Sequence, residues 1–347
     1  MKSSKSKIAE SDLLGLKNPV GLGWKNLQEL KNPAGFGWKT ILTAFVLICG
    51  SACDNDKIYQ EEQYQNVVCL LSGAENVYTE VYTLNETEPV RYFSVVCGGS
   101  KPNTEEVVVT FEHDHVLLDQ YNKNNFDVDE SKYAQMLTAD RYEIASYTAT
   151  IPANPVDQYV KVPVIVRPLG LSPDSTYFIP IAIKSVSRYE VNEEKYNMLY
   201  RVTIENDYAQ QRTTTYYTKK GTELNQSNNN STVLSGLKTV QPLTKEKVRM
   251  FAGNYLQSQT TTVTDIERYA IVVEVNEDNT LDITPYGTIE VEKLDADDYN
   301  LYDPEVMQGT KTQRVFFLYY RYRTLNANGT YSAWMEVKES LTRVEED

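Results

Sequence analysis

Histidine is almost missing from this chain. Its 347 residues include only two, His113 and His115, which fall in one place. A serine hydrolase would have to take its general base from this spot, and no Gly-x-Ser-x-Gly nucleophile elbow exists to accompany it. Two histidines alternating on one face of a strand are spaced like metal ligands, but no further ligands are identifiable. We therefore expect no serine hydrolase, no metal centre and no cofactor, and we interpret the pair as a strand end leading into a turn at Asp114.

Long apolar runs are also absent. The run at residues 41–48 has about half the ~20 residues that a membrane-spanning helix needs. Lys39 precedes it, and the small residues 50–52 follow it, directly before Cys53. A basic flank, a short apolar stretch and small residues in this order are typical of a cleavable signal, so we expect residues 1–52 to be removed.

The segment around Cys53 resembles the lipobox of bacterial lipoproteins. Ser51 and Ala52 fit that pattern, whereas Gly50 stands where leucine is usual. The resemblance implies a diacylated Cys53, and two acyl chains give the stable anchoring that one chain cannot. The acidic residues Asp54 and Asp56 resemble the surface-export signal of Bacteroidetes lipoproteins, which implies an outer-membrane protein facing the exterior; a solvated acidic tether over residues 53–65 is the alternative.

Residues 16–25 recur with few changes as residues 30–39. Two Pro-Gly segments of this length cannot form a solenoid, which needs at least about three repeats of 20 residues or more. We interpret them as an extended n-region of the signal and leave them out of the fold.

Positive charge is in short supply as well. The whole chain carries 34 basic and 48 acidic residues, and residues 53–347 retain 27 basic and 45 acidic ones. This excess of negative charge argues against partners such as nucleic acid and anionic lipid surfaces.

Tyrosine is abundant, with 26 residues against nine phenylalanines. Tyrosine suits strands, and it also suits stacking on sugars or peptides at a wet surface.

Residues 66–207 are predicted to form an immunoglobulin-like β-sandwich. Residues 159–166 place four valines on one face, and residues 105–112 repeat this alternation of period two. Other strands are expected at residues 76–83, 90–96, 177–183 and 198–204, within a sandwich of seven strands. Pro163 and Pro180 then belong on edges or bulges. The only helix expected here covers residues 129–137, capped by Asp129.

Residues 212–347 are predicted to form a second antiparallel β domain, either a sandwich or a short lipocalin-like barrel. The boundary is placed at residues 208–211, and the Asn/Ser tract at 225–232 is expected to be an exposed loop. A short helix is expected at residues 245–251. Strands are expected at residues 269–275, 281–284, 289–293, 314–323, 331–338 and 341–344, with hairpin turns at 276–279 and at Asn328-Gly329.

Cys69 and Cys97 are the cysteines that remain beyond Cys53. An oxidising compartment would permit a disulfide between them. Both lie in apolar runs, so buried free thiols are the simpler interpretation, and the sequence cannot supply the distance that would decide.

The two predicted domains together resemble two-domain surface lipoproteins of Bacteroidetes, in which an immunoglobulin-like domain precedes a C-terminal β domain, both of unknown function. The likeness rests on core and turn segments at residues 121–122, 142–144, 177–183, 200–204, 249–253, 283–286, 316–322 and 339–343. Ala252 stands where proline is expected. The resemblance implies membership in a polysaccharide-utilisation system, near an outer-membrane importer of the starch-utilisation type, with a glycan as ligand.

Residues 314–323 offer the clearest candidate binding surface. One face of this strand carries large apolar side chains and is expected to be core, while Tyr319 and Arg321 share the other. Tyr331 and Trp334 of the following hairpin extend that second face, and rings and guanidiniums together can bind sugars. Tyr299 and Tyr302 are weaker candidates from a loop. The alternative is a half-buried, tyrosine-rich sheet without a ligand.

Carboxylates are too numerous to locate a catalytic pair by sequence. Glycoside hydrolysis needs two of them about 5 to 10 Å apart, and no pattern of a chitinase-type endoglycosidase is present. The acidic residues between 295 and 305 lack the glycine of a calcium-binding EF-hand loop and are expected to be solvated. The sequence therefore favours a non-catalytic glycan-binding lipoprotein; a structural or adhesive protein that binds a protein partner is the alternative, and a glycoside hydrolase is the third possibility.

Replacing Cys53 by serine should abolish incorporation of labelled palmitate, because the thioether-forming side chain is lost. Cys49 lies inside the apolar run and should leave with the signal, so Cys49→Ser is the matched control and should be labelled like the native chain. Labelling would be followed in cells by autoradiography of the immunoprecipitated protein. Label retained by the Cys53→Ser chain, or absent from the native chain, contradicts the predicted anchor.

Overall fold

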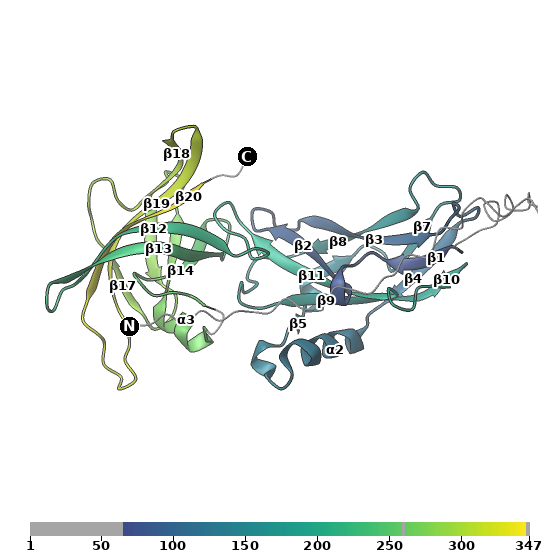
Figure 1. Cartoon of the computed structure of the whole chain (residues 1–347), viewed down its shortest axis with the longest axis horizontal. Coiled ribbons are helices and arrows are strands. Elements are labelled where there is room, and N and C mark those ends of the chain that lie inside the picture. The colour runs from purple at the N-terminus through teal and green to yellow at the C-terminus, as the bar shows by residue number, and fades with distance from the viewer. Residues whose placement is uncertain (1–64, 259–260, 345–347) are drawn as a thin grey trace, which may run out of the picture. The chain divides into compact units, whose positions relative to one another are not determined.

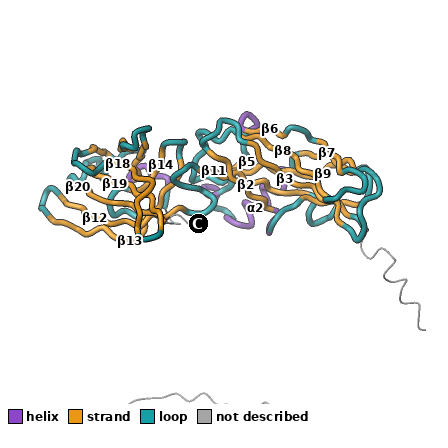
Figure 2. The backbone as a smooth tube through the Cα atoms, turned by 90° about the horizontal axis from the view of Figure 1, so that it is seen from above, coloured by secondary structure: helices purple, strands orange, loops and turns teal. Residues whose placement is uncertain are grey.

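The computed structural model of the chain describes residues 65–258 and 261–344. Strands contain 51% of the residues and helices 10%, which confirms the all-β prediction (Figure 1). Figure 2 shows the same dominance of strands along the backbone. The predicted signal and Cys53 lie outside the described residues. Within those residues no helix combines the length and apolar character needed to cross a membrane.

The N-terminal part is a sandwich of two sheets, with strand orders β10-β1-β3-β8-β6 and β2-β11-β9-β4-β7, and with β5 paired to β9. Its strands are β1 (Val67–Leu70), β2 (Val77–Thr83), β3 (Val90–Gly98), β4 (Val107–Glu112), β5 (Gln135–Met136), β6 (Tyr142–Ile144), β7 (Thr148–Ile151), β8 (Tyr159–Val166), β9 (Tyr177–Val186), β10 (Glu190–Val191) and β11 (Asn197–Glu205). All six strands that the sequence predicted here are present. The short strands β1, β5, β6, β7 and β10 were not predicted.

The sandwich core follows from the alternation within each strand. On β8, Val162, Val164 and Val166 are buried, as predicted. The hydroxyls of Tyr82 and Tyr200 lie 2.6 Å apart inside this core, so the two buried polar groups satisfy each other. Such pairing lets large aromatic side chains fill the space between the sheets without an unpaired hydroxyl.

Pro180 lies within β9, a strand that is paired on both sides. Strand β5 pairs with β9 only at Tyr177 and Phe178, and β4 pairs with it from Ala182 onward. Pro180 therefore falls in the gap between these two partners, where proline removes no ladder hydrogen bond on that side. The expected local edge is present even though the strand is central.

Cys69 and Cys97 are both free. They sit on the adjacent antiparallel strands β1 and β3, where Cys97 pairs in register with Val68 rather than with Cys69. Burial raises the pKa of both thiols. The simpler interpretation of these residues, as free thiols, agrees with the structure.

The main helix of the sandwich was not predicted where it occurs. Helix α2 (His115–Phe126) begins after Asp114, whose side chain accepts hydrogen bonds from the Val116 and Leu117 amides. It packs on the outer face of the second sheet through Leu118, which contacts a small cluster around Phe178. The predicted helix at 129–137 is wrong: that segment contains only the 3-10 turn η2 (Glu130–Lys132) and β5.

Two further 3-10 turns occur in the sandwich, η1 (Ala74–Asn76) and η3 (Ala139–Arg141). The interpretation of His113 and His115 as a strand end agrees with the structure, because β4 ends at Glu112; the segment leads into α2, which His115 opens, rather than into a simple turn.

The C-terminal part is a nearly closed antiparallel barrel, the second of the two architectures left open by the sequence. Its strand order is β16-β15-β14-β13-β12-β20-β19-β17, with β18 also paired to β19. The strands are β12 (Thr215–Asn225), β13 (Asn230–Pro242), β14 (Lys247–Phe251), β15 (Ala270–Val275), β16 (Leu281–Pro285), β17 (Glu290–Lys293), β18 (Leu301–Gln308), β19 (Lys311–Arg323) and β20 (Met335–Val344). A short helix, α3 (Val263–Tyr269), begins with a capping box at Thr262.

Side chains close the gap between the terminal strands of this sheet. Lys293 on β17 donates to the Leu281 carbonyl at 3.3 Å and to the Asp282 carboxylate at 2.6 Å, both on β16. No backbone ladder joins β16 to β17, so the barrel is nearly rather than fully closed. The hydrogen bonds of Lys293 link the two strands across this gap.

Three sequence predictions for the barrel need correction. The Asn/Ser tract at 225–232 was expected to be an exposed loop, yet β12, which begins at Thr215, and β13 extend into it and form a hairpin that turns there. The predicted helix at 245–251 is strand β14, and residues 341–344 continue β20 rather than forming a separate strand. The turns predicted at 276–279 and at Asn328-Gly329 are confirmed by the hydrogen bonds that close them.

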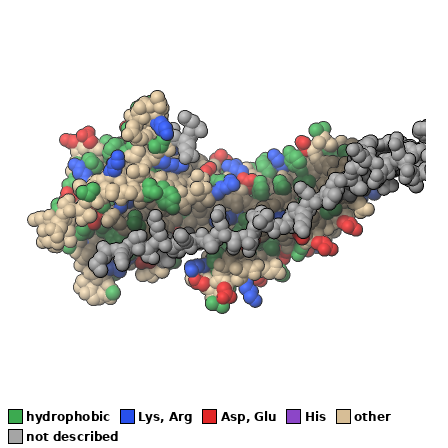
Figure 3. All heavy atoms as spheres, viewed as in Figure 1, with side chains coloured by type: hydrophobic (Ala, Val, Ile, Leu, Met, Phe, Trp, Pro, Cys, Tyr) green, Lys and Arg blue, Asp and Glu red, His purple; other side chains and the backbone are tan. Residues whose placement is uncertain are grey.

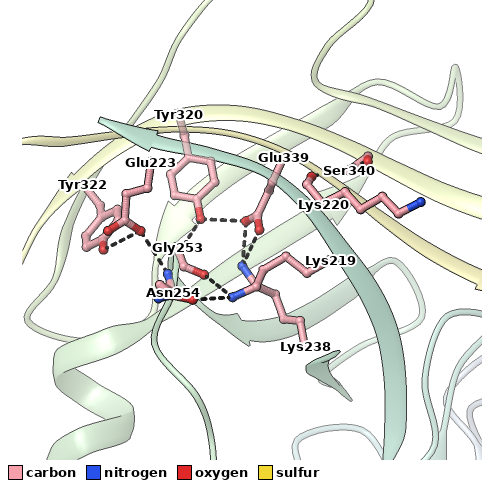
Figure 4. Close-up of polar contacts among 10 residues, drawn as sticks. All are labelled: Lys219, Lys220, Glu223, Lys238, Gly253, Asn254, Tyr320, Tyr322, Glu339 and Ser340. Carbon is pink, nitrogen blue, oxygen red and sulfur yellow. Dashed lines mark hydrogen bonds and ion pairs between the residues drawn. The ribbon is translucent and has the colours of Figure 1, made fainter. Parts of the chain in front are cut away.

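The barrel interior holds a buried network of charged and phenolic groups (Figure 4). Lys238 donates to both oxygens of Glu339, at 2.6 and 2.8 Å, and neither side chain is more than 2% exposed. Tyr320 donates to the same carboxylate at 3.0 Å. Burial, followed by the negative charge of Glu339, raises the pKa of Tyr320 well above its usual value, so this phenol stays a donor.

A second half of the network fixes the turn that follows β14. Lys219 donates to the Gly253 carbonyl at 3.2 Å and to the Asn254 side chain at 3.0 Å, while Glu223 accepts from the Asn254 amide at 2.9 Å. Burial, and then the nearby Lys238 charge, lowers the pKa of Lys219. Gly253 has φ +49°, and a Cβ here would lie 2.1 Å from the Glu223 carboxylate, so only glycine fits.

We expect Glu339→Gln to lower the free energy of unfolding by about 3–5 kcal/mol, because it leaves the Lys238 charge buried without its counter-ion. The double variant Lys238→Met with Glu339→Leu should lose much less, since no unpaired charge remains. Glu277→Gln, in an exposed turn without an ion pair in the described chain, should change stability by less than about 0.5 kcal/mol. Urea denaturation measures all three, and a Glu339→Gln effect no larger than that of Glu277→Gln contradicts the buried pair.

Candidate ligand-binding surface

The outward side chains of β19 and its neighbours form the strongest candidate surface of the barrel. Phe316, Leu318 and Tyr320 point into the barrel core, as the sequence predicted. The alternate residues point outward and meet the hairpin that joins β19 to β20. We call this surface the β19 outer face, and it comprises Tyr299, Tyr319, Arg321, Arg323, Tyr331, Trp334 and Lys338.

Trp334 lies at one end of this face, against two guanidiniums. The Cζ atoms of Arg321 and Arg323 are 4.6 and 4.7 Å from the centre of its ring. Arg323 also lies 4.8 Å from the ring centre of Tyr331, which is 37% exposed. Two cation–π contacts hold the indole in one place. This reduces the side-chain conformational entropy that would be lost when a ligand binds.

Tyr319 and Tyr299 form the other end. Their ring centres are 6.2 Å apart at 66°, and the Lys338 ammonium lies 4.5 Å from the Tyr299 ring and 5.4 Å from the Tyr319 ring. Tyr319 donates to Glu336 at 2.7 Å, and this bond, more than its slight burial, raises the pKa of the phenol. The structure thus brings together residues from β19, β20 and a loop before β18.

Both arginines of the face are paired with carboxylates of β17. Arg321 donates to Glu292 at 2.7 Å and Arg323 to Glu290 at 2.6 Å, each across one step of the β17–β19 ladder. The guanidiniums are therefore oriented and their charges are balanced locally. Figure 3 shows basic and acidic side chains scattered over one side of the molecule rather than gathered by sign.

Tyr302 does not belong to this surface. It was expected in a loop, but it lies in β18, is only 6% exposed and packs against Tyr208 and Phe316. Burial raises the pKa of its phenol. A ring placed in the core cannot stack on a ligand.

Arg323 and Lys338 complete the face, although neither was selected from the sequence. The signal for Arg323 was available, because it has the same parity on β19 as Tyr319 and Arg321. Lys338 could be found only from the cross-strand register, in which it pairs with Tyr319. Sequence spacing alone does not provide that register.

His113 and the buried acidic residues of the described chain are engaged in hydrogen bonds. His113 interacts through its two ring nitrogens with the Pro180 carbonyl and the Tyr147 hydroxyl, at 3.1 and 2.8 Å. No group of three or more histidine, cysteine or acidic side chains suited to a metal occurs among residues 65–258 and 261–344. The buried Glu223 and Glu339 already accept the hydrogen bonds described above, so they are held as structural acceptors.

Comparisons with known proteins support the two-part organisation. A family model described as an N-terminal domain matches residues 57–190, and one described as a C-terminal domain matches residues 196–342. No curated protein matches the chain.

Several solved structures share the fold. A Bacteroides ovatus protein of unknown function from structural genomics has a TM-score of 0.63 at 18% identity, over 80% of this chain and 94% of its own. A multidomain protein from the same species has a TM-score of 0.60 at 17% identity, with the same coverage of both chains. An auxiliary nutrient binding protein from Bacteroides thetaiotaomicron has a TM-score of 0.55 at 14% identity, over 79% of this chain and 92% of its own.

At these identities the likeness shows the fold alone. The sheet topology, the two matched family models and the shared fold agree with one another. The chain is thus a two-domain β protein, with an N-terminal and a C-terminal domain that each match a known family model, and it resembles two-domain proteins of Bacteroides.

Proposed function

We propose that this protein is a non-catalytic glycan-binding lipoprotein and that the β19 outer face binds the sugar. The observation that carries the proposal is the convergence of Trp334, Tyr331, Tyr319 and Tyr299 on one surface, interleaved with Arg321, Arg323 and Lys338. Rings offer their faces to the C–H surfaces of a sugar, and the N–H donors between them reach its hydroxyls.

The charge balance of this face indicates a neutral glycan. Arg321 and Arg323 are each neutralised by a β17 carboxylate, and Glu336 accompanies Lys338 on β20. A neutral sugar adds no charge to this arrangement, whereas a carboxylate would compete with Glu290 and Glu292 for the same donors.

Fold similarity to the auxiliary nutrient binding protein of Bacteroides thetaiotaomicron supports a role in capture rather than catalysis. The predicted lipidation of Cys53 and the acidic residues after it support tethering to the outer membrane, on the exterior side. In this position the protein would hold oligosaccharides for an outer-membrane importer of the starch-utilisation type. We propose no catalytic activity for this protein.

A second candidate function is adhesion to a protein partner. The β12–β13 hairpin carries Val233 and Leu237 on its outward face, at 75% and 55% exposure. Exposed apolar side chains on a strand are typical of surfaces that contact other proteins. Co-purification of a stable protein partner through this hairpin, without affinity for any sugar, would favour this alternative.

Trp334→Ala should weaken binding of a neutral oligosaccharide about tenfold, because the central ring of the face is removed. Tyr319→Ala should weaken it several-fold. Tyr92→Ala is the matched control, since this tyrosine is 45% exposed on the sandwich and far from β19 in the sequence, and it should bind like the native protein. Affinity gel electrophoresis against a panel of neutral plant and host glycans, followed by calorimetry on those that retard migration, measures the effect.

Three outcomes would count against this proposal: no retardation on any neutral glycan, equal losses in Trp334→Ala and Tyr92→Ala, or release of reducing ends from the oligosaccharide. The last would indicate a glycoside hydrolase. Thermal unfolding of each variant identifies losses that come from misfolding.

A further inference from the structure

Strand β13 has a neighbouring strand on one side only along most of its length. Residues 230–240 pair with β12, whereas β14 pairs with β13 only at residues 240–242. No other strand of the described chain pairs with β13. Residues 230–239 therefore form an open edge of the barrel sheet, which we call the β13 edge. Figure 1 shows the β12–β13 hairpin extending beyond β14 to its turn.

The ladder on the other side of the hairpin determines which backbone groups face this opening. The Gln226 amide donates to the Trp334 carbonyl at 3.0 Å and continues the β12–β20 register, so even-numbered residues of β12 direct their N–H and C=O groups at β20. Odd-numbered residues of β12 then face β13, where each pairs with an even-numbered residue. The N–H and C=O groups that face the open side belong to Ser231, Val233, Ser235 and Leu237.

The β13 edge lacks the features that usually prevent a strand from pairing with another chain, namely prolines, outward charges, bulges and a covering segment. Residues 230–241 contain no proline, and their only charged side chain, Lys238, is buried and paired with Glu339. The register with β12 runs through the hairpin without a shift. All residues from 230 to 237 are exposed except Leu234, which packs in the barrel core. This edge is therefore open to a further strand.

The charge distribution favours a second copy of this chain as the source of that strand. The chain carries 48 acidic against 34 basic residues, so two copies repel each other over much of their surface. Residues 224–244, which contain the whole β13 edge, include no acidic residue. Two copies can therefore approach along this edge without placing the carboxylates of one β13 segment against those of the other.

The edge is also complementary to itself. When two copies pair antiparallel about a two-fold axis at Ser235, Val233 of one copy lies opposite Leu237 of the other. The backbone groups of these three residues all face the opening, so each of the resulting pairs can exchange N–H···O=C bonds. The side chains of the same residues lie on the outer surface, where Val233 and Leu237 are the exposed apolar ones. The register that forms the hydrogen bonds therefore also brings the apolar side chains together.

We propose that this protein forms a two-fold symmetric dimer in which the β13 edges of two copies pair antiparallel and join the two barrel sheets. The contact involves one strand from each copy and is smaller than a standard protein interface, so a dissociation constant of about 1–100 μM fits it. A dimer of this kind occupies the hairpin that the adhesion alternative would use for a different protein. It does not depend on glycan binding by the β19 outer face.

Sedimentation equilibrium tests the dimer. The full chain carrying Cys53→Ser is used, so that the predicted acyl chains cannot cause association. Its average mass should rise from that of one chain to that of two between about 1 and 500 μM. Ser235→Pro removes the central N–H on the open side and leaves the β12 ladder intact, so it should raise the dissociation constant at least about tenfold. Val128→Glu changes an exposed valine of the sandwich and should dimerise like the parent chain.

A pair of charge variants tests the register. One chain carries Val233→Glu with Leu237→Glu, and the other carries Val233→Lys with Leu237→Lys. Each alone should remain monomeric, because like charges lie opposite each other across the strands. An equimolar mixture should form dimers with one chain of each kind, because every such pair then joins opposite charges. Sedimentation of the mixture with a fluorescent label on one chain detects them. Val128→Glu and Val128→Lys are the matched controls, and each should dimerise without the other.

The proposal is overturned if the Cys53→Ser chain stays monomeric at about 500 μM, if Ser235→Pro associates as strongly, or if the two charge variants form no mixed dimer. Growth beyond two chains would also overturn it, because two-fold pairing uses both edges. Thermal unfolding identifies variants that misfold, and the exposed positions 233 and 237 keep the test decisive if Ser235→Pro does not fold. Trp334→Ala should dimerise normally, which separates this result from the glycan-binding test.

Discussion

Strand β19 carries two rows of side chains with opposite roles, and the register of its neighbours keeps those rows apart. Residues of one parity, among them Phe316 and Tyr320, fill the barrel, while Tyr319 and Arg321 face outward. A shift of one residue against β17 or β20 would exchange the two rows and place guanidiniums in the core. The ladders on both sides of β19 therefore determine the core, the buried network and the candidate surface at once.

The buried ion network makes this register more demanding than an apolar core would. Glu339 on β20 must meet Lys238 on β13 and Tyr320 on β19 within hydrogen-bond distance, because each group loses water when the barrel forms. An apolar side chain tolerates a small displacement, whereas an unpaired buried charge does not. We regard the network as a device that selects one strand arrangement, at some expense in stability compared with an apolar interior.

Strands with a strong period-two alternation could be predicted from the sequence, whereas strands in which this alternation is weak or interrupted could not. Strand β8 was located to the residue, because its valines alternate without exception. Strands β12 and β13 were missed because Lys219, Glu223 and Lys238 occupy inward positions, so the alternation of polarity is lost where the buried network lies.

The remaining errors have equally specific causes. Helix α2 is rich in asparagine, which favours caps and turns over helix interiors. It is stabilised by its packing on the sheet, by the Asp114 cap and by the hydrogen bonds between the Asn122 side chain and the Ala134 backbone. The β14 segment is too short for helix and strand periodicities to be distinguished. Tyr302 precedes an irregularity in the β18–β19 register, and the acidic residues around it suggested a loop. The outward row of β19 could be predicted, but its partner Lys338 depends on which strands become neighbours.

Strand β20 supports both polar features of the barrel. It contributes Lys338 to the β19 outer face and the next residue, Glu339, to the interior network. Successive side chains of a strand point to opposite faces, so the same register that brings Lys338 to Tyr319 also brings Glu339 to Lys238. Because β20 is bonded on both sides along most of its length, neither contact can shift without the other. The buried ion pair thus fixes the position of the strand that carries Lys338 on the candidate surface.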